Sequence, residues 1–275
     1  MNGSGRAPAA DSRMVVNQGI PGNRQHSPHA VTIPTAVDAW VQLNRDYGSK
    51  PLSYLLDPAI DYAENGFPIG QRVAADFAAS RELILRDPDM AEQYLNNGGD
   101  FKFGERLANP RLGKTMREIA ARGRDGFYKG WVAEDMVSKL NALGGVHTQA
   151  DFDNAVAEYV EPIKTNFRGY DIWECPPNGQ GIIALMLLNI ASKIDKFGNN
   201  PLSLERMHHE IEAGKLAYRD RGLYVGDTEF NEVSMEAMLS QEHAEAIRAL
   251  IDPDQALSEL LHAHYRPIRA PSTSQ

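Results

Sequence analysis

The chain has 275 residues, of which 42% are hydrophobic and 24% charged, as expected of a globular protein that can bury a sizeable core. Its formal net charge of −9 argues against a nucleic-acid partner, which would require a basic face. No apolar run approaches the roughly 20 residues that a membrane-spanning helix needs. The single cysteine, Cys175, excludes an internal disulfide.

A series of amphipathic helices is predicted in the first half of the chain. Apolar residues recur at helical spacing over residues 35–47, 53–65, 71–86, 110–122 and 132–143. Gly66 follows the second segment, and a glycine there is a common helix end. Asp57-Pro58 should mark a helix start or break, because proline removes a helical hydrogen bond. A short helix is expected after Asp87-Pro88.

The central stretch, residues 162–189, predicts a hairpin followed by a buried helix. Strands are expected over 162–167 and 170–174, joined by a turn at Arg168-Gly169, since alternate residues of the second strand share a face. Pro176-Pro177 ends the pairing because proline has no N–H to donate. Residues 182–190 are almost entirely apolar, which predicts a helix buried on most sides. On spacing alone, this is an ordinary hairpin leading into a core helix.

The last third predicts three more helices and a polar tail. These helices span 203–221, 234–250 and 253–264, and the tail covers 266–275. In the longest helix, Leu204, Met207, Ile211, Leu216 and Tyr218 supply the apolar content. Asp220 and Arg221 end this helix, and we interpret them as tying it to the following loop rather than as catalytic groups.

Three features resemble reactive or metal-binding groups, and each has a simpler interpretation. Cys175 stands beside Pro-Pro at a strand end and is predicted to be a buried structural thiol rather than a nucleophile. His26 and His29 have no acidic or cysteine ligands nearby. His208-His209 with Glu212 lacks the H-E-x-x-H arrangement of a zinc helix. We therefore predict no metal and no cofactor.

Seven motifs in one order carry a family resemblance over nearly the whole chain. They are NGSGRAP (2–8), AVTIPTAVDAW (30–40), DPAIDYAENGFPI (57–69), GFYKG (126–130), the central stretch with CPPNGQG (175–181), EAGKLAYRDR (212–221) and VGDTEF (225–230). Together they resemble the large subunit of the γ-glutamyltransferase (γ-glutamyltranspeptidase) family, and most of all its bacterial branch with the CPPNGQG turn.

The resemblance implies an α+β fold. Residues 1–275 would form one large-subunit region, the mostly helical part of an α/β/β/α N-terminal-nucleophile hydrolase sandwich, with one clear β-hairpin. Met1 falls well inside the family pattern, so we expect the region to be truncated at its N-terminus and to lack the catalytic small subunit.

The resemblance also implies a reaction. In the family a precursor cuts itself before a threonine, whose hydroxyl then forms an acyl-enzyme with the γ-glutamyl group of a substrate such as glutathione. Water or an acceptor amine completes hydrolysis or transfer. The threonine is expected outside this chain, because Thr273, in PSTSQ, lacks the family context and belongs to the tail. We thus predict no catalytic residue here, no activity of the chain alone, and a small subunit from the same precursor as its partner.

One substrate-binding residue is carried over from the family, Arg6. The family places an arginine near this point to bind the substrate α-carboxylate, and a guanidinium offers a planar fork of donors that matches a carboxylate. Aligned on Ala7-Pro8, however, Ser4 takes the usual arginine position and Arg6 is the nearby arginine. The alternative is a structural or solvated arginine. The alternating Gly3 and Gly5 suit a backbone that passes close to a ligand or another strand.

Two other functions and the compartment stay open. A related acylase would cleave glutaryl or other amide side chains, for example in cephalosporins, with the same machinery. A helical scaffold that has lost its catalytic half would not be an enzyme. With no visible signal peptide we favour the cytoplasm, while a periplasmic or secreted location stays open because the N-terminus is expected to be missing.

Overall fold

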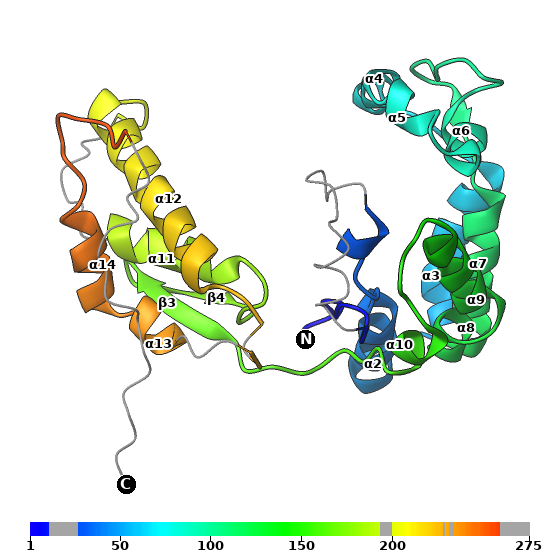
Figure 1. Cartoon of the computed structure of the whole chain (residues 1–275), viewed down its shortest axis with the longest axis horizontal. Coiled ribbons are helices and arrows are strands. Elements are labelled where there is room, and N and C mark those ends of the chain that lie inside the picture. The colour runs from blue at the N-terminus through cyan, green and yellow to red at the C-terminus, as the bar shows by residue number, and fades with distance from the viewer. Residues whose placement is uncertain (11–26, 193–199, 228, 231–233, 259–275) are drawn as a thin grey trace, which may run out of the picture. The chain divides into compact units, whose positions relative to one another are not determined.

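The computed structural model describes residues 1–10, 27–192, 200–227, 229–230 and 234–258. The chain divides into two compact units (Figure 1). Unit 1 consists of Met1–Ser4 and Glu158–Gln275, and unit 2 of Gly5–Ala157.

Over its described residues, unit 2 is built almost entirely from helices. Its elements are η2 (Pro28–Ala30), α2 (Ala36–Tyr47), α3 (Leu52–Asn65), α4 (Gln71–Ala79), α5 (Arg81–Ile84), α6 (Pro88–Tyr94), α7 (Pro110–Arg122), α8 (Asp125–Tyr128), α9 (Trp131–Ala142), α10 (Gln149–Asp153) and the short strands β1 (Phe67–Pro68) and β2 (Arg106–Leu107). The helices predicted at 35–47, 53–65, 110–122 and 132–143 are confirmed within one residue at each end.

Two predictions in unit 2 are wrong. Pro58 lies inside α3 rather than at a helix start or break, and the helix continues because its next turns bury Ile60 and Ala63 against the core. The segment 71–86 forms two helices instead of one. The two helices separate at Ser80, whose N–H donates to the carbonyls of both Asp76 and Phe77. The bond to Phe77 tightens the last turn of α4, as often happens where a helix ends.

A buried carboxylate organises the core of unit 2. Asp38 of α2 is 3% exposed and accepts hydrogen bonds from the backbone N–H of Ala157 at 2.8 Å and from Gln42 at 2.7 Å. The Arg124 guanidinium lies 3.1 Å from the same carboxylate and donates to the carbonyl of Ala155 at 2.8 Å. Because the Asp38 carboxylate is hydrogen-bonded and ion-paired, its charge can be buried. The same contacts hold Ala155 and Ala157, at the C-terminal end of unit 2, against α2.

Unit 1 contains the predicted hairpin. Strands β3 (Ile163–Phe167) and β4 (Tyr170–Glu174) pair antiparallel, with Ile163 opposite Glu174. The two residues between them have positive φ, 50° at Arg168 and 90° at Gly169. That is the pattern of a two-residue type I′ turn, whose twist matches the strands. The predicted strands and turn are confirmed.

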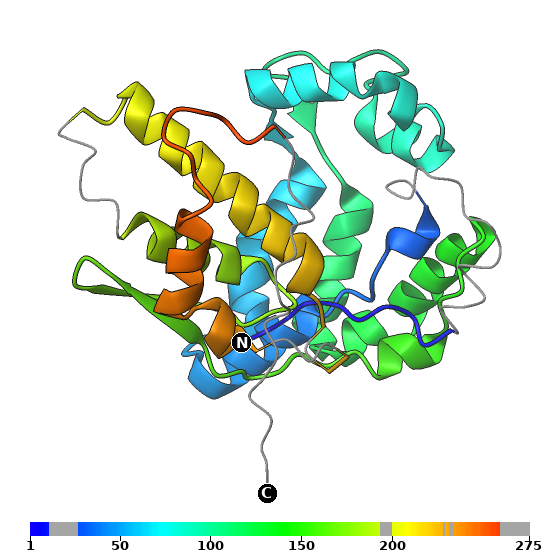
Figure 2. The same cartoon turned by 60° about the vertical axis from the view of Figure 1, so that its left-hand side comes forward.

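Helix α11 (Gly181–Ala191) is the centre of the core of unit 1. It packs with β3, α12 (Leu204–Tyr224) and α14 (Gln241–Arg248), and α13 (Met235–Met238) lies beside α14 (Figures 1 and 2). Ile182 and Leu185 are fully buried, and Met186 and Ile190 nearly so. The prediction that this helix is buried on most sides is confirmed.

In the longest helix, α12, most of the apolar residues singled out in the sequence are exposed, and Leu216 is the one that is buried. Leu204, Met207, Ile211 and Tyr218 are 45–85% exposed, whereas Ala213, Leu216 and Ala217 are at most 3% exposed. The two alanines meet α11, where small side chains allow a close approach of the two backbones. The helix also runs on to Tyr224, so Asp220 and Arg221 do not end it.

The C-terminal helices differ from the prediction as well. Residues 234–250 form two helices, because Ser240 caps α14 by accepting from the N–H of His243. Residues 253–258 are not helical, and the rest of the predicted helix lies outside the described residues. The fold class itself, mostly helical with one clear hairpin, is confirmed.

Candidate functional site

Two of the sequence motifs meet in unit 1. Asn2 of NGSGRAP forms an antiparallel bridge with Glu158: its N–H donates to the Glu158 carbonyl at 2.7 Å, and the Glu158 N–H donates back at 3.0 Å. The Asn2 side chain donates to Oδ1 of Asn178, in the CPPNGQG turn, at 3.3 Å. The structure therefore brings together segments 176 residues apart in sequence. We name this place the Asn2–Asn178 corner.

The corner offers neutral hydrogen-bonding groups and one thiol. Oδ1 of Asn2 accepts from the backbone N–H of Ser4 at 3.0 Å. Cys175 lies at the corner with its Sγ 3.8 Å from the carbonyl oxygen of Met1, and its side chain is exposed. The prediction of a buried thiol is wrong: Cys175 continues the outward face of β4, on which Asp171 and Trp173 are also exposed.

The turn requires a glycine where it enters α11. A Cβ placed on Gly181 would lie 2.5 Å from Oε2 of Glu174 and 2.9 Å from its Cβ. Glu174, at the end of β4, is half-buried. A carboxylate at a helix N-terminus is stabilised by the helix dipole. The groups at this corner can therefore position a ligand or a neighbouring segment by hydrogen bonds and the helix dipole. They do not form a paired acid and base.

Arg6, the predicted substrate-binding residue, belongs to unit 2. Its side chain is exposed, and its carbonyl accepts a hydrogen bond from the N–H of Ile33 at 2.9 Å. A Cβ on the preceding Gly5 would fall 1.8 Å from the Ile33 carbonyl oxygen. The expectation that glycine lets this backbone pass close to another segment is confirmed at Gly5. The binding role of Arg6 stays a prediction, as does the alternative that it is a structural or solvated arginine.

The other candidates are accounted for by ordinary contacts or are not described. His208 contacts the carbonyl of Asp252 and His209 that of Glu205, each at 2.8 Å. Among the described residues, no group of three or more histidine, cysteine, aspartate or glutamate side chains is placed to hold a metal. His26 and Thr273 lie outside the described residues. Within the same limits, none of the helices is long and apolar enough to cross a membrane.

The sequence did not reveal a buried charged cluster in unit 1. Asp220 of α12 is fully buried, and its carboxylate lies 2.8 Å from the Arg219 guanidinium and 2.9 Å from Nε2 of His243 on α14. We expected Asp220 to tie a helix end to a loop, which is wrong; it joins two helices. Two adjacent charged residues in a long helix do not by themselves predict a buried cluster. His243 lies too far along the chain for sequence spacing to link it to Asp220.

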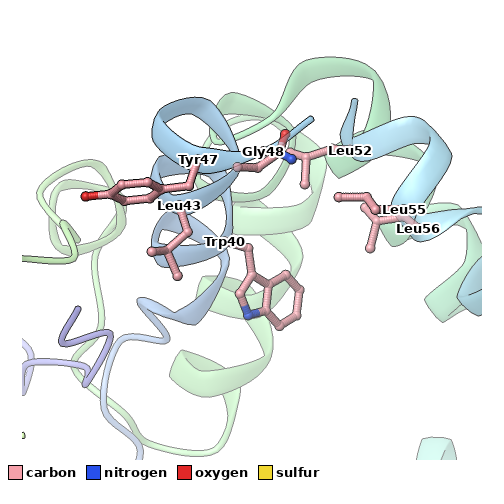
Figure 3. A pocket seen from close by; sticks show the side chains of 8 residues that line it. Trp40, Leu43, Tyr47, Gly48, Leu52, Leu55 and Leu56 are labelled. Atoms are coloured by element: carbon pink, nitrogen blue, oxygen red, sulfur yellow. The ribbon is translucent and has the colours of Figure 1, made fainter. Parts of the chain in front are cut away.

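Two surface grooves of unit 2 are formed by residues that the structure describes. One, of about 390 Å³, lies between α2 and α3 and is lined by apolar side chains that include Trp40, Leu43, Leu52 and Leu55 (Figure 3). Asn44 and Tyr47 are the polar side chains of its lining, and neither a carboxylate nor a histidine stands beside them there. The second groove lies between α6, α7 and α9 and has charged walls.

Known structures and sequences define the class of protein. The structure superposes on the crystal structure of Helicobacter pylori gamma-glutamyltranspeptidase with a TM-score of 0.86, at 28% identity, covering 94% of this chain and 75% of that one. Cephalosporin acylase from Bacillus halodurans gives a TM-score of 0.83 at 33% identity, covering 91% of this chain and 48% of that one. The fold is that of this group of N-terminal-nucleophile hydrolases.

The family follows from the sequence match. The gamma-glutamyltranspeptidase profile matches residues 1–275, and the chain belongs to that family. A glutathione hydrolase proenzyme from Pseudomonas sp. (strain A14) is 33% identical over 229 residues, which are 82% of this chain and 40% of the relative. The chain thus spans about two fifths of the length of the curated relatives it matches. The resemblance carried by the seven motifs is confirmed.

Proposed function

We propose that this chain is the large-subunit part of an enzyme that transfers or hydrolyses γ-glutamyl amides, glutathione among them. The observation that carries the proposal is the family match over residues 1–275. Since the chain spans about two fifths of its curated relatives, we place the nucleophilic threonine in a partner segment of the same precursor, outside these residues.

The proposed reaction is a double displacement. The threonine hydroxyl attacks the γ-carbonyl carbon while its own α-amine accepts the proton, and the amide C–N bond breaks as that proton passes to the leaving amine. The resulting ester is attacked by water, which gives glutamate, or by an acceptor amine, which gives a new γ-glutamyl amide. Either product restores the free hydroxyl. No cofactor is needed for these steps.

The part assigned to this chain is binding and positioning. Arg6 is exposed and can present its guanidinium to the substrate α-carboxylate. The Asn2–Asn178 corner supplies a fixed set of neutral polar groups and holds the CPPNGQG turn against the N-terminal segment. Without the threonine, the chain alone is proposed to be inactive.

The test is reconstitution. The chain is co-expressed with the segment encoded immediately downstream and assayed with γ-glutamyl p-nitroanilide. We expect turnover from the complex, none from the chain alone, and none when the first threonine of the downstream segment is replaced by alanine. Turnover by the chain alone would contradict the placement of the nucleophile.

Arg6 is tested in the same complex. Arg6→Gln should raise KM for the anilide by about tenfold or more, because a charge-assisted hydrogen bond is lost, while kcat changes little. Arg45→Gln is the matched control, since Arg45 is an exposed arginine of the same unit whose guanidinium lies 2.7 Å from the neighbouring Asp46. An unchanged KM in Arg6→Gln would assign the carboxylate to another residue.

An acylase is the second candidate. The cephalosporin acylase is 33% identical to this chain, and so is the glutathione hydrolase proenzyme, so identity does not separate the two functions. What favours the acylase is that Ser4 stands where the family most often has its carboxylate-binding arginine. Glutaryl p-nitroanilide, which lacks the α-amino and α-carboxyl groups, separates the two functions: preference for it over the γ-glutamyl compound would establish the acylase. Failure to form any complex would favour a scaffold.

A further inference from the structure

The groove between α6, α7 and α9 has the size of a ligand site. Its volume is about 780 Å³, within the range of roughly 300–1,000 Å³ that small-molecule pockets occupy. Ion pairs join its walls: Lys139 of α9 lies 2.7 Å from Asp87 and 2.8 Å from Asp89, and Arg111 of α7 lies 2.8 Å from Glu92. The hydrogen bond from Lys139 holds the pKa of Asp87 below its usual range.

Apolar side chains are left uncovered inside this groove. Met90, Leu112 and Leu143 line it and are 37%, 44% and 56% exposed. Trp131, the first residue of α9, lines it too and is half-buried. A concave surface with several uncovered apolar groups gains free energy when an apolar ligand displaces water from it.

Two opposite charges flank Trp131. Nζ of Lys114 lies 4.3 Å from the centroid of the Trp131 ring, and Asp135 follows Trp131 by one helical turn on α9. Both residues line the groove. Lys139 and Arg111 are occupied by the ion pairs of the walls, whereas neither Lys114 nor Asp135 forms an ion pair with any residue in the described ranges.

We propose that this groove binds short zwitterionic peptides with apolar side chains. The peptide carboxylate pairs with Lys114, its ammonium group pairs with Asp135, and its side chains cover Trp131 and Leu143. The lining carries three aspartates and three basic residues, so its charge is balanced and suits neither a polyanion nor a polycation. The site lies within unit 2 and does not depend on the proposed acyl transfer.

The test is isothermal titration of the full chain with three probes. Trileucine carries both terminal charges, N-acetyl-trileucine lacks the ammonium, and trileucine amide lacks the carboxylate. We expect trileucine to bind about three- to fivefold more tightly than either analogue, the range that a partly exposed ion pair supports. Asp135→Asn should abolish only the discrimination against the acetylated peptide, and Lys114→Gln only that against the amide.

Lys129→Gln is the control, because Lys129 is an exposed lysine that pairs with Asp125 at 3.1 Å outside the groove. It should leave all three affinities unchanged. Equal affinity for the three probes, absence of saturable trileucine binding, or an equal effect of Lys129→Gln would each overturn the proposal. Both substituted groove residues are exposed, and thermal melts that match the wild-type chain establish that the variants are folded.

Discussion

The hydroxyl of Thr165 donates a hydrogen bond to Oδ1 of Asn189, which joins strand β3 to the buried helix α11. Asn189 is 2% exposed, and its Nδ2 donates to the carbonyl of Leu239 at 2.8 Å. One amide group therefore links β3, α11 and the end of α13. It is the polar exception in an apolar helix, and its satisfied partners make its burial tolerable.

Replacing Asn189 by leucine should destabilise unit 1 by about 2–4 kcal/mol, since the Thr165 hydroxyl and the Leu239 carbonyl would both be left buried and unpaired. Urea denaturation measures the loss. Thr165→Val removes one partner, and the double variant should cost less than the sum of the two single changes, because the two groups interact directly. If the losses of the two single variants add up to that of the double variant, the Thr165–Asn189 hydrogen bond has no interaction energy of its own.

Gly126→Ala should destabilise unit 2 by about 1–3 kcal/mol. A Cβ at this position would lie 2.2 Å from the carbonyl oxygen of Glu118, in the backbone of α7, so α8 would have to move away from α7. Thermal melting gives the measurement. Gly70→Ala is the control: its φ of −73° suits any residue and nothing lies within 4 Å, so a change within about 0.5 kcal/mol is expected. A neutral Gly126→Ala would contradict the close approach.

Local signals were enough to predict elements whose ends are encoded locally. Helix α7 has the predicted bounds because Asn109 caps it by accepting from the N–H of Leu112, Pro110 occupies its first turn, and Gly123, with φ of 57°, ends it. The β3–β4 hairpin was predictable for the same reason, since its turn residues and its alternation lie within a dozen positions. Neither element needs a distant partner to define its limits.

Faces and clusters that depend on partners were not predictable. Helical spacing groups Leu204, Met207 and Ile211 on one side of α12, but it does not say which side meets α11, and alanines made the closer fit. Asp220 and His243 are 23 positions apart, and only the packing of α12 on α14 brings them together. The exposure of Cys175 was readable from the alternation of β4, although its neighbouring prolines suggested otherwise.

The pH dependence of unit 2 should show the burial of Tyr128. Its side chain is fully buried and donates to the carbonyl of Pro34 at 2.8 Å, and burial raises its pKa to about 12. The folded state therefore keeps the proton where the unfolded chain loses it, above about pH 10. The stabilisation is complete below pH 10 and is lost as the pH rises towards 12, by up to about 1.4 kcal/mol per pH unit.

Tyr128→Phe separates this effect from the ionisation of the other tyrosines. At neutral pH the variant should be less stable by about 1–3 kcal/mol, because the Pro34 carbonyl and the Asp38 N–H lose their partner. Between pH 10 and 12 its stability should fall less steeply than that of the wild-type chain. Parallel pH curves for the two proteins would show that Tyr128 ionises equally in both states.

Removal of Asp220 should be the most damaging single change in unit 1. Asp220→Ala leaves Arg219, which is 7% exposed, and His243, which is 4% exposed, without the carboxylate that lies between them. Breaking a buried ion pair from one side costs about 3–5 kcal/mol, because the remaining charge stays buried. Asp220→Asn keeps the shape and should lose less. Glu245→Gln, on the exposed side of α14, serves as the control and should stay within about 0.5 kcal/mol. Equal stability of Asp220→Ala and Glu245→Gln in urea would mean that α12 and α14 are held together by their apolar contacts alone.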